Sequence, residues 1–213
     1  MQHNSPHAPR RRLVVASGNP GKLREFRALL GDLSFDVVAQ SDLRVDPPEE
    51  SGSSFLENAL LKARHAAVAT QAAAIADDSG LEVDALGGAP GIYSARYAGA
   101  LADDAANNAK LKAALAGLPA EARRARYRCV LAYVAGPDDA APLTAEGVWE
   151  GMICDTPRGS GGFGYDPYFW LPERNATVAE LDPAEKNRCS HRAMALRTFR
   201  GLLALRETPP ACG

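Results

Sequence analysis

The sequence predicts an α/β fold built on a mixed sheet rather than on a purely parallel one. Two βα units open the chain, two β-rich runs joined by a turn fill its middle, and a helix ends it. Strands that alternate with helices favour parallel pairing, whereas strands joined by a short turn pair antiparallel. With 213 residues and 46% hydrophobic content, the chain can bury one large core, and no break in composition marks a linker.

The first unit is a strand followed by a tight glycine turn and a helix. Residues 13–16 form a β-branched apolar run that predicts a buried strand. Asn19 is expected to cap the next helix, and Pro20 fits its first position, where a missing N–H costs nothing. Apolar residues recur at helical spacing over 22–30. The turn therefore delivers Lys22 to the start of a helix.

The turn itself is a candidate phosphate site. Free N–H groups, the positive end of the helix dipole and the Lys22 ammonium would point to one place. It is not a Walker A loop, because Ala16 occupies the first glycine position and Leu23 replaces the serine or threonine. It is not a Rossmann fingerprint either, because no Gly-x-Gly-x-x-Gly follows the strand. The alternative is a plain strand-to-helix turn with a solvated lysine.

A capping pattern marks a long helix in the second unit. Ser54 followed three residues later by Glu57 is a capping box, and the helix is expected to end at about Gln71. The apolar run over 72–76 predicts a short strand that ends where Asp77 begins a polar cluster.

The remaining elements follow from alternation and helix caps. Residues 127–135 and 143–153 are β-rich, and the Gly-Pro-Asp-Asp stretch between them predicts a hairpin. Ser190 is expected to cap the final helix, whose apolar face is Ala193, Leu196, Phe199, Leu202 and Leu203. The other predicted segments are a strand over 35–40, an acidic loop over 46–52, an extended segment over 81–86, a glycine turn over 87–91, a helix capped by Asp103 or Asp104 that ends near Gly117, a glycine-rich loop over 159–164 and a helix capped at Asp182.

Composition narrows the classes of partner. The formal net charge of −2 gives no global argument for nucleic acid or a membrane surface. No apolar run approaches the length of a bilayer span, and the polar residues 1–12 lack the apolar core of a secretory signal. The four cysteines form no C-x-x-C pair, and no histidine pair has metal spacing. We therefore expect a reduced, cytoplasmic protein that binds neither nucleic acid nor membrane.

Asp77 and Asp78 are candidates for catalysis. Open α/β sheets place catalytic groups at strand ends, which is where the predicted strand leaves this pair. Adjacent residues on a strand point to opposite faces, so only one carboxylate can face a given cleft. A carboxylate there can bind Mg²⁺ or accept a proton from water. A turn in which both aspartates cap backbone N–H groups is an equally good interpretation.

Other charged residues could complete such a site. Glu49 or Glu50 could supply a second Mg²⁺ ligand, although a solvated acidic loop is the default interpretation of exposed charges. Lys62 could reach a phosphate if its helix face turned toward Lys22. Arg192 lies at a helix start, where its charge opposes the dipole unless an anion is bound there.

The glycine-rich loop is a candidate for holding a flat base. Its glycines are followed by Phe163, whose ring could stack on a base, and by Asp166, which could accept from ring N–H groups. Lys186, just upstream of the helix that begins at Ser190, would add a donor. The alternative is a glycine-rich turn with core aromatics, and periodicity does not separate the two.

Five segments together resemble the inosine/xanthosine triphosphate pyrophosphatases, which hydrolyse non-standard purine nucleoside triphosphates to monophosphate and pyrophosphate. The segments are ASGNPGK (16–22), FLENALLKARHAA (55–67), ADDSGLEVDALGGAPGIYSARYAG (76–99), GGFGYDPYF (161–169) and SHRAMAL (190–196). They follow the family's order, and the resemblance covers nearly the whole chain except about the first eleven residues and the last few.

The resemblance implies an elongated, two-lobed α/β fold with a central mixed, twisted sheet flanked by helices and an active-site cleft between the lobes. It implies one domain over 12–207, between a disordered extension over 1–11 and a tail over 208–213. It also implies a homodimer.

The resemblance further implies the roles of individual residues. Asp78 would accept a proton and bind Mg²⁺, with Glu50 as a second ligand. The substrate would be ITP, dITP or XTP, whose 6-oxo group could accept from His191, Arg192 and backbone N–H groups. The implied substrate contacts are Ser17, Gly18, Asn19, Pro20, Gly21, Lys22, Lys62, Ser79, Phe163, Gly164, Tyr165, Asp166, Lys186, His191 and Arg192.

Two alternatives remain open. One is a related pyrophosphatase of the septum-inhibitor type, which prefers pyrimidine or modified nucleotides, and the FGYD and SHR stretches argue against it. The other is a nucleotide sensor without turnover. The joint presence of Asp78, Glu50 and Lys22 argues against a sensor.

Overall fold

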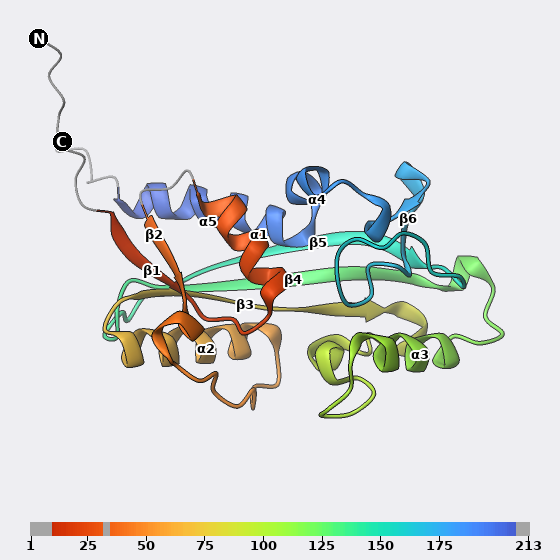
Figure 1. The fold of residues 1–213 in the computed structure, drawn as a ribbon, viewed down its shortest axis with the longest axis horizontal. Helices are drawn as coiled ribbons and strands as arrows, with labels where there is room; N and C mark the ends of the chain where they lie inside the picture. Colours follow the sequence, from red (N-terminus) through yellow and green to blue (C-terminus); the bar gives the residue numbers. More distant parts are fainter. Residues whose placement is uncertain (1–9, 32–34, 208–213) are drawn as a thin grey trace, which may run out of the picture.

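In the part of the chain that a computed structural model describes, residues 10–31 and 35–207, seven strands form one mixed sheet (Figure 1). The strands are β1 (Arg11–Val15), β2 (Phe35–Ala39), β3 (Ala73–Val83), β4 (Arg124–Val134), β5 (Leu143–Ile153), β6 (Phe169–Leu171) and β7 (Ala176–Thr177). Their order is β2-β1-β3-β4-β5-β6-β7. β1 pairs parallel with β2 and β3, whereas the later pairs are antiparallel. The predicted α/β class with a mixed sheet is confirmed.

Helices cover both faces of this sheet. Figure 1 shows α1 (Pro20–Leu30), α4 (Pro183–Cys189) and α5 (His191–Glu207) on one face, and α2 (Phe55–Thr70) and α3 (Asp104–Ala114) on the other. Short 3-10 helices lie between them at Gln40–Leu43, Asp84–Leu86, Gly91–Arg96, Ala120–Ala122, Pro172–Arg174 and Val178–Glu180. The molecule is elongated along the strands of the sheet.

Successive side chains along a strand point to opposite faces of the sheet, and this divides the core into layers. Leu13 and Val15 pack with Phe26 of α1 and Phe199 of α5, whereas Val14 packs with the buried alanines of α2. Those alanines have short side chains, so α2 can lie close to the sheet. A further cluster at the other end, formed by Leu81, Leu111, Leu115, Tyr127, Trp149 and Phe169 among others, supports α3.

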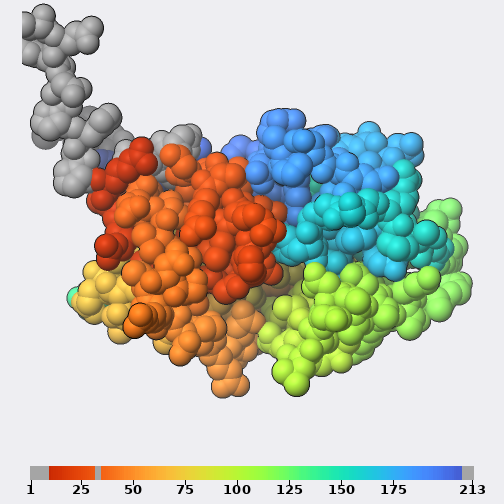
Figure 2. All heavy atoms as spheres, viewed as in Figure 1, coloured from red at the N-terminus to blue at the C-terminus, as the bar shows by residue number. Residues whose placement is uncertain are grey.

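β3 extends beyond the end of its parallel neighbour β1, and this difference in length creates the cleft. β1 pairs with Ala73, Ala74 and Ile75 only, whereas β3 continues to Val83. The prediction that a short strand ends before Asp77 was therefore wrong. The reason is the antiparallel ladder with β4, which continues unbroken past Asp77 and Asp78 and holds the polar cluster in mid-strand. Figure 2 shows a hollow where the red and orange segments meet the green and teal ones.

Local signals placed the helix starts correctly. The Asn19 side chain accepts from Lys22 N at 3.1 Å, with Pro20 as the first residue of α1. Ser54 accepts from Glu57 N at 3.2 Å, but the Glu57 carboxylate accepts from the backbone of Ser53 rather than of Ser54, so the capping box is shifted by one residue.

The other three capping predictions are also settled, and Asp182 accepts from Ala184 N at 2.8 Å and so caps α4 as expected. Asp103, not Asp104, caps α3, and this helix ends at Ala114 rather than near Gly117. Ser190 accepts from Ala193 N at 3.3 Å and so caps α5 as expected.

The predicted terminal segments fall largely outside the described residues. The expected extension over 1–11 lies outside them up to residue 9, and β1 begins at Arg11. The expected tail over 208–213 lies wholly outside them. Within the described part of the chain, no helix has the length and apolar character that a membrane span requires.

Candidate active site

The polar residues of β3 lie in the part of this strand that extends beyond the end of β1. Their side chains point alternately toward the helices on the two faces of the sheet. Asp77 and Ser79 face α1 and α5, and their side chains bond Arg192 of α5. Asp78 faces α2 and bonds Lys62. The prediction that neighbouring carboxylates would point to opposite faces is confirmed.

Asp77 lies among cations. Its Oδ2 is 3.0 Å from Lys22 Nζ and accepts from Arg192 Nη2 at 2.8 Å and from Ser79 Oγ at 2.9 Å. Burial raises the pKa of this carboxyl, but the charges of Lys22, Arg192 and Lys62 outweigh burial and hold its pKa far below the ordinary value. Asp77 is therefore ionised at neutral pH.

Arg192 is a buried anchor. It is 1% exposed, forms ion pairs with Asp77 and Glu25, and donates to Ser79 Oγ at 3.0 Å. The argument that its place at a helix start calls for an anionic ligand is corrected here, because two carboxylates of the protein supply the anions. Burial lowers its pKa, and these two carboxylates more than offset that effect.

Asp78 belongs to a separate cluster with one central cation. Lys62 Nζ donates to Asp78 Oδ1 at 2.7 Å and to Glu50 Oε1 at 2.9 Å. Asn58 Nδ2 donates to Asp78 Oδ2 at 3.3 Å. Of the two loop glutamates, Glu50 turns inward, whereas Glu49 is exposed.

The ionisation of Asp78 is disfavoured. Burial raises the pKa of this carboxyl, the Lys62 ammonium opposes that rise without cancelling it, and Glu50 adds repulsion. Lys22, although it lies on the other face, acts electrostatically on both Asp78 and Glu50. The Lys22 charge therefore acts on both clusters, although they lie on opposite faces of β3.

The same two carboxylates suit a divalent cation. Glu50 and Asp78 already converge on one positive charge, the Lys62 ammonium. Mg²⁺ in phosphate-handling sites is commonly held by one or two carboxylates together with waters and substrate phosphates. Among the described residues, no group of three or more histidines, cysteines or acids converges. Water and substrate would have to supply the remaining ligands.

A cavity beside Lys22 and Ser79 has a wall of stacked rings. The rings of Tyr127 and His191 lie 4.8 Å apart at 18°, and Tyr127 stacks on Phe169 from its other side. His191 is buried; burial first, and then the charges of Arg192 and Lys186, lower its pKa well below the usual value, so the ring is neutral. Its Nδ1 is buried without a hydrogen-bond partner among the described residues.

Asp166 holds the loop rather than facing the cavity with a free carboxylate. Its Oδ1 accepts from Tyr127 Oη at 3.0 Å, and its Oδ2 accepts from Lys186 Nζ at 2.7 Å and from Phe163 N at 3.0 Å. Both oxygens already accept from the protein, so the carboxylate is engaged in holding the loop, and acceptance from a base stays a prediction.

Phe163 joins the two predicted binding segments. A Cβ on Gly21 would lie 2.5 Å from Phe163 Cδ1, so only glycine allows the ring to lie this close to the start of α1. The Lys186 ammonium lies 4.6 Å from the centre of the same ring. The structure thus brings together the turn at Ser17, Gly18, Asn19, Pro20, Gly21 and Lys22 and the segment Phe163, Gly164, Tyr165 and Asp166.

Sequence reasoning missed several residues that build this site. Glu25 of α1 pairs with both Arg192 and Lys186, the latter at 3.0 Å. Asn58 fixes Asp78 and accepts from Gly52 N at 2.8 Å. The available signal for Asn58 was its spacing: Asn58 and Lys62 are polar residues four apart on the alanine-rich face of α2.

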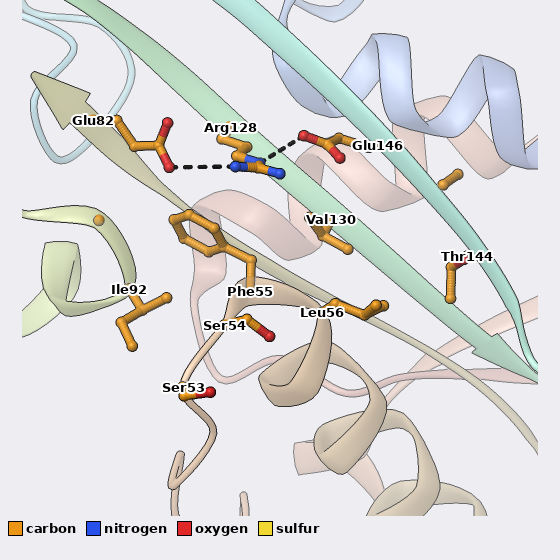
Figure 3. Close-up of a pocket in the computed structure, with 12 residues that line it drawn as sticks. Ser53, Ser54, Phe55, Leu56, Glu82, Ile92, Arg128, Val130, Thr144 and Glu146 are labelled. Carbon is orange, nitrogen blue, oxygen red and sulfur yellow. Dashed lines mark ion pairs between the residues drawn. The ribbon is translucent and has the colours of Figure 1, made fainter. Parts of the chain in front are cut away.

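A second, more open groove lies on the α2 side of the sheet (Figure 3). Phe55, Ile92 and Val130 line it, and Arg128 spans it with ion pairs to Glu82 and Glu146 at 3.5 and 2.6 Å. None of the site residues predicted from the sequence lines this groove.

The fold and the site define a class of protein: a mixed α/β protein whose cleft pairs cationic and acidic side chains beside an aromatic wall. The chain belongs to the Ham1 family, whose sequence model matches residues 13–202. It is 58% identical over 187 residues to a dITP/XTP pyrophosphatase of Xanthomonas campestris, covering 88% of this chain and 94% of that protein. It is 57% identical over 202 residues to a dITP/XTP pyrophosphatase of Burkholderia pseudomallei, covering 93% and 96%.

Solved structures of the family share the fold. The HAM1 protein of Coxiella burnetii superimposes with a TM-score of 0.83 at 47% identity, covering 91% of this chain and 98% of that one. The Ham1 protein of Staphylococcus aureus gives a TM-score of 0.80 at 42% identity, covering 92% and 100%. These similarities confirm the family that the five sequence segments indicated.

Proposed function

We propose that this protein hydrolyses non-standard purine nucleoside triphosphates, namely ITP, dITP and XTP, to the nucleoside monophosphate and pyrophosphate. The observation that carries the proposal is the arrangement at the edge of β3. There the Lys22–Asp77 pair and the Lys62–Asp78–Glu50 cluster lie on the two faces of one strand, beside a cavity walled by rings. The names of the relatives supply the class of substrate.

The triphosphate is expected to lie along the turn before α1. Helix N–H groups and the Lys22 ammonium favour an anion there. Lys62 offers a second ammonium from the opposite layer, close to where Asp78 would act. A polyanion bridging the two lysines would be neutralised from both sides, which lowers its repulsion of an attacking oxygen.

Asp78 is the group best placed to accept a proton. Water attacks the α-phosphorus, the bond from that phosphorus to the bridging oxygen breaks, and pyrophosphate leaves; the proton of the water passes to the Asp78 carboxylate. A carboxyl with a raised pKa is a better base than an ordinary one, because the most effective general base has a pKa near the working pH.

Glu50 and Asp78 would hold Mg²⁺. The bound ion would supply positive charge that stabilises the phosphate oxygens. Arg96 Nη1 donates to Glu50 Oε2 at 2.8 Å and thereby orients this carboxylate toward Lys62 and Asp78.

Base selection is assigned to the ring-walled cavity. The neutral His191 ring and backbone N–H groups can donate to a 6-oxo group, whereas the 6-amino group of adenine would leave those donors unpaired, which discriminates strongly. Arg192 contributes indirectly, since its guanidinium is engaged by Asp77 and Glu25. Guanine shares the 6-oxo group, so its rejection must come from its 2-amino group.

One assay tests the proposed function. Pyrophosphate release is measured with ITP, dITP, XTP, GTP, ATP and UTP, with and without Mg²⁺. Release from the first three that requires Mg²⁺ supports the proposal. A preference for UTP would favour the septum-inhibitor type instead, and tight binding of ITP without release would favour a sensor.

The family resemblance also leads us to propose a homodimer. Sedimentation equilibrium at micromolar concentration measures the mass directly. A mass of one chain at concentrations that support full activity would contradict a dimer.

A further inference from the structure

One face of α3 holds both polar backbone groups of Gly164. Gly164 N donates to Asp104 Oδ2 at 2.7 Å, and Asn108 Nδ2 donates to Gly164 O at 2.9 Å. Asp104 and Asn108 are four residues apart, so they lie on the same face of the helix. Asn108 Nδ2 also donates to the backbone O of Asp104 at 2.8 Å, which fixes the Asn108 side chain against the backbone of α3.

Gly164 lies in the middle of the segment that forms one side of the cavity. Its neighbour Phe163 packs on Gly21, and Tyr165 Oη donates to Ser94 O at 2.7 Å. Asp166 completes the segment by bonding Lys186. Because the four residues are consecutive, displacement of Gly164 displaces the ring on one side and the carboxylate on the other.

The contact with α3 joins the two layers of the molecule. Figure 1 shows α3 on the face of the sheet opposite to α1 and α4, whereas Phe163 and Asp166 contact α1 and α4. Asp104 and Gly164 both line the cavity. The contact therefore lies where one layer meets the other around the binding cavity.

α3 is itself firmly attached, so it can serve as a support. Asn107 is buried; its Oδ1 accepts from Ala98 N at 2.8 Å and its Nδ2 donates to Ala95 O at 3.1 Å. Leu111 and Leu115 pack into the core at this end of the sheet. Movement of the loop relative to this support thus requires the Asp104 and Asn108 contacts to break.

We propose that Asp104 and Asn108 are positioning residues that hold the 163–166 segment in its binding position through Gly164. The inference rests on the proposed function and extends it, since neither residue touches a reacting group in the mechanism above. Without the contacts, the segment samples positions in which Phe163 and Asp166 are displaced. Only the fraction of molecules with the segment in place binds nucleotide well, so the apparent affinity falls by that fraction while the bound complex reacts as before.

The test compares Asp104→Ala with Asp103→Ala. Asp103 caps the same helix by accepting from Ala106 N at 2.8 Å, and it does not contact Gly164. Asp103→Ala therefore weakens α3 and leaves the contact intact. Asp104→Asn keeps an oxygen that can accept from Gly164 N and serves as the conservative variant, and Asn108→Ala removes the other half of the contact.

Two readouts are used. Hydrogen exchange of the 163–166 amides reports the contact without any turnover. For Asp104→Ala we expect faster exchange there and a KM for dITP raised about threefold to tenfold, the range that one lost hydrogen bond produces, with kcat within about twofold. Asn108→Ala should behave alike, Asp104→Asn should stay close to wild type in both readouts, and Asp103→Ala should change neither.

Several results would overturn the inference. Unchanged exchange in Asp104→Ala would show that the contact does not hold the loop. An equal rise in KM for Asp103→Ala would trace the effect to helix stability. A fall in kcat at constant KM would place Asp104 in the chemistry instead. If wild-type protein releases no pyrophosphate, the proposed function fails, and the dissociation constant of dITP then replaces KM in the same comparison.

Discussion

Asp77 and Asp78 are neighbours on β3, yet they lie in opposite electrostatic situations. Asp77 is surrounded by Lys22, Arg192 and Ser79, and its pKa is lowered. Asp78 shares one lysine with Glu50, and its pKa is raised. The difference arises because strand alternation sends the two side chains into different layers.

This difference distinguishes a carboxylate that stabilises the fold from the one that we propose accepts a proton. A carboxylate with cations on every side is a poor base, since its protonation would leave those cations without a negatively charged partner. A carboxylate whose ionisation is already disfavoured accepts a proton readily. We therefore assign stability to Asp77 and proton transfer to Asp78, and four measurements can break or sharpen that assignment.

The largest effect is expected for Asp78→Asn. Loss of the proton acceptor should lower kcat by about 10²–10⁴-fold, the usual contribution of a general base. Nucleotide binding should be largely retained, because Lys22 and the ring-walled cavity are untouched. Single-turnover kinetics and titration calorimetry with dITP measure the two quantities. Turnover close to that of wild type would remove Asp78 from the proton-accepting role.

Asp77→Asn should act on stability instead. It leaves the buried Arg192 with Glu25 as its remaining charged partner, and breaking a buried ion pair typically costs about 3–5 kcal/mol. The free energy of unfolding is measured by urea titration. Asp78→Asn in the same titration is the matched control, and equal losses in the two variants would contradict the assignment.

Lys22→Ala should mainly weaken triphosphate binding. A charge-assisted hydrogen bond contributes about 1.5–3 kcal/mol, so the dissociation constant of dITP should rise about tenfold to a hundredfold. The deoxyinosine nucleoside, which carries no phosphate, is the control ligand. A similar loss of affinity for the nucleoside would mean that Lys22 only supports the fold through Asp77.

The smallest effect is a pH dependence with opposite signs for the two aspartates. The folded pKa of Asp77 lies below its ordinary value of 3.8, so its stabilisation is complete above that pH and is lost as the pH falls further. The folded pKa of Asp78 lies above 3.8, so its ionisation costs stability as the pH rises through and above that value.

Urea titrations across pH measure both signs. Stability lost by Asp77→Asn should shrink toward acid pH. Asp78→Asn should be at least as stable as wild type at neutral pH and should lose that advantage in acid. Parallel pH profiles for the two variants would mean that the layers do not differ electrostatically.

The sequence predicted what depends on neighbours along the chain. Asn19, Ser54 and Ser190 were assigned as caps because a capping side chain and the backbone N–H that donates to it lie within three residues. The length of β3 was missed, since it depends on pairing with β4, about fifty residues downstream. Polar residues end a strand only when nothing in the adjacent layers satisfies them.

The prediction of the site residues was likewise limited to features that depend on neighbours along the chain. Motif reasoning found Lys22 and Asp78, because each lies in a recognisable segment. Glu25 pairs with Arg192 across 167 residues, and nothing near Glu25 in the chain hints at that partner. Arg192 itself was selected on a correct observation, its unfavourable position at a helix start, but the anions proved to belong to the protein.

The short length of β1 has a consequence for engineering this scaffold. β1 stops opposite Ile75, and the next residue, Ala16, still donates to Ile75 O at 2.8 Å. Two more residues of extended backbone would bring the first strand alongside Asp77. Main-chain hydrogen bonds between β1 and β3 would then close the gap beside β3. Grafts that transplant this region must therefore keep the early exit of the first strand, because lengthening it by a single pleat would fill the space beside Asp77, where we propose that the nucleotide binds.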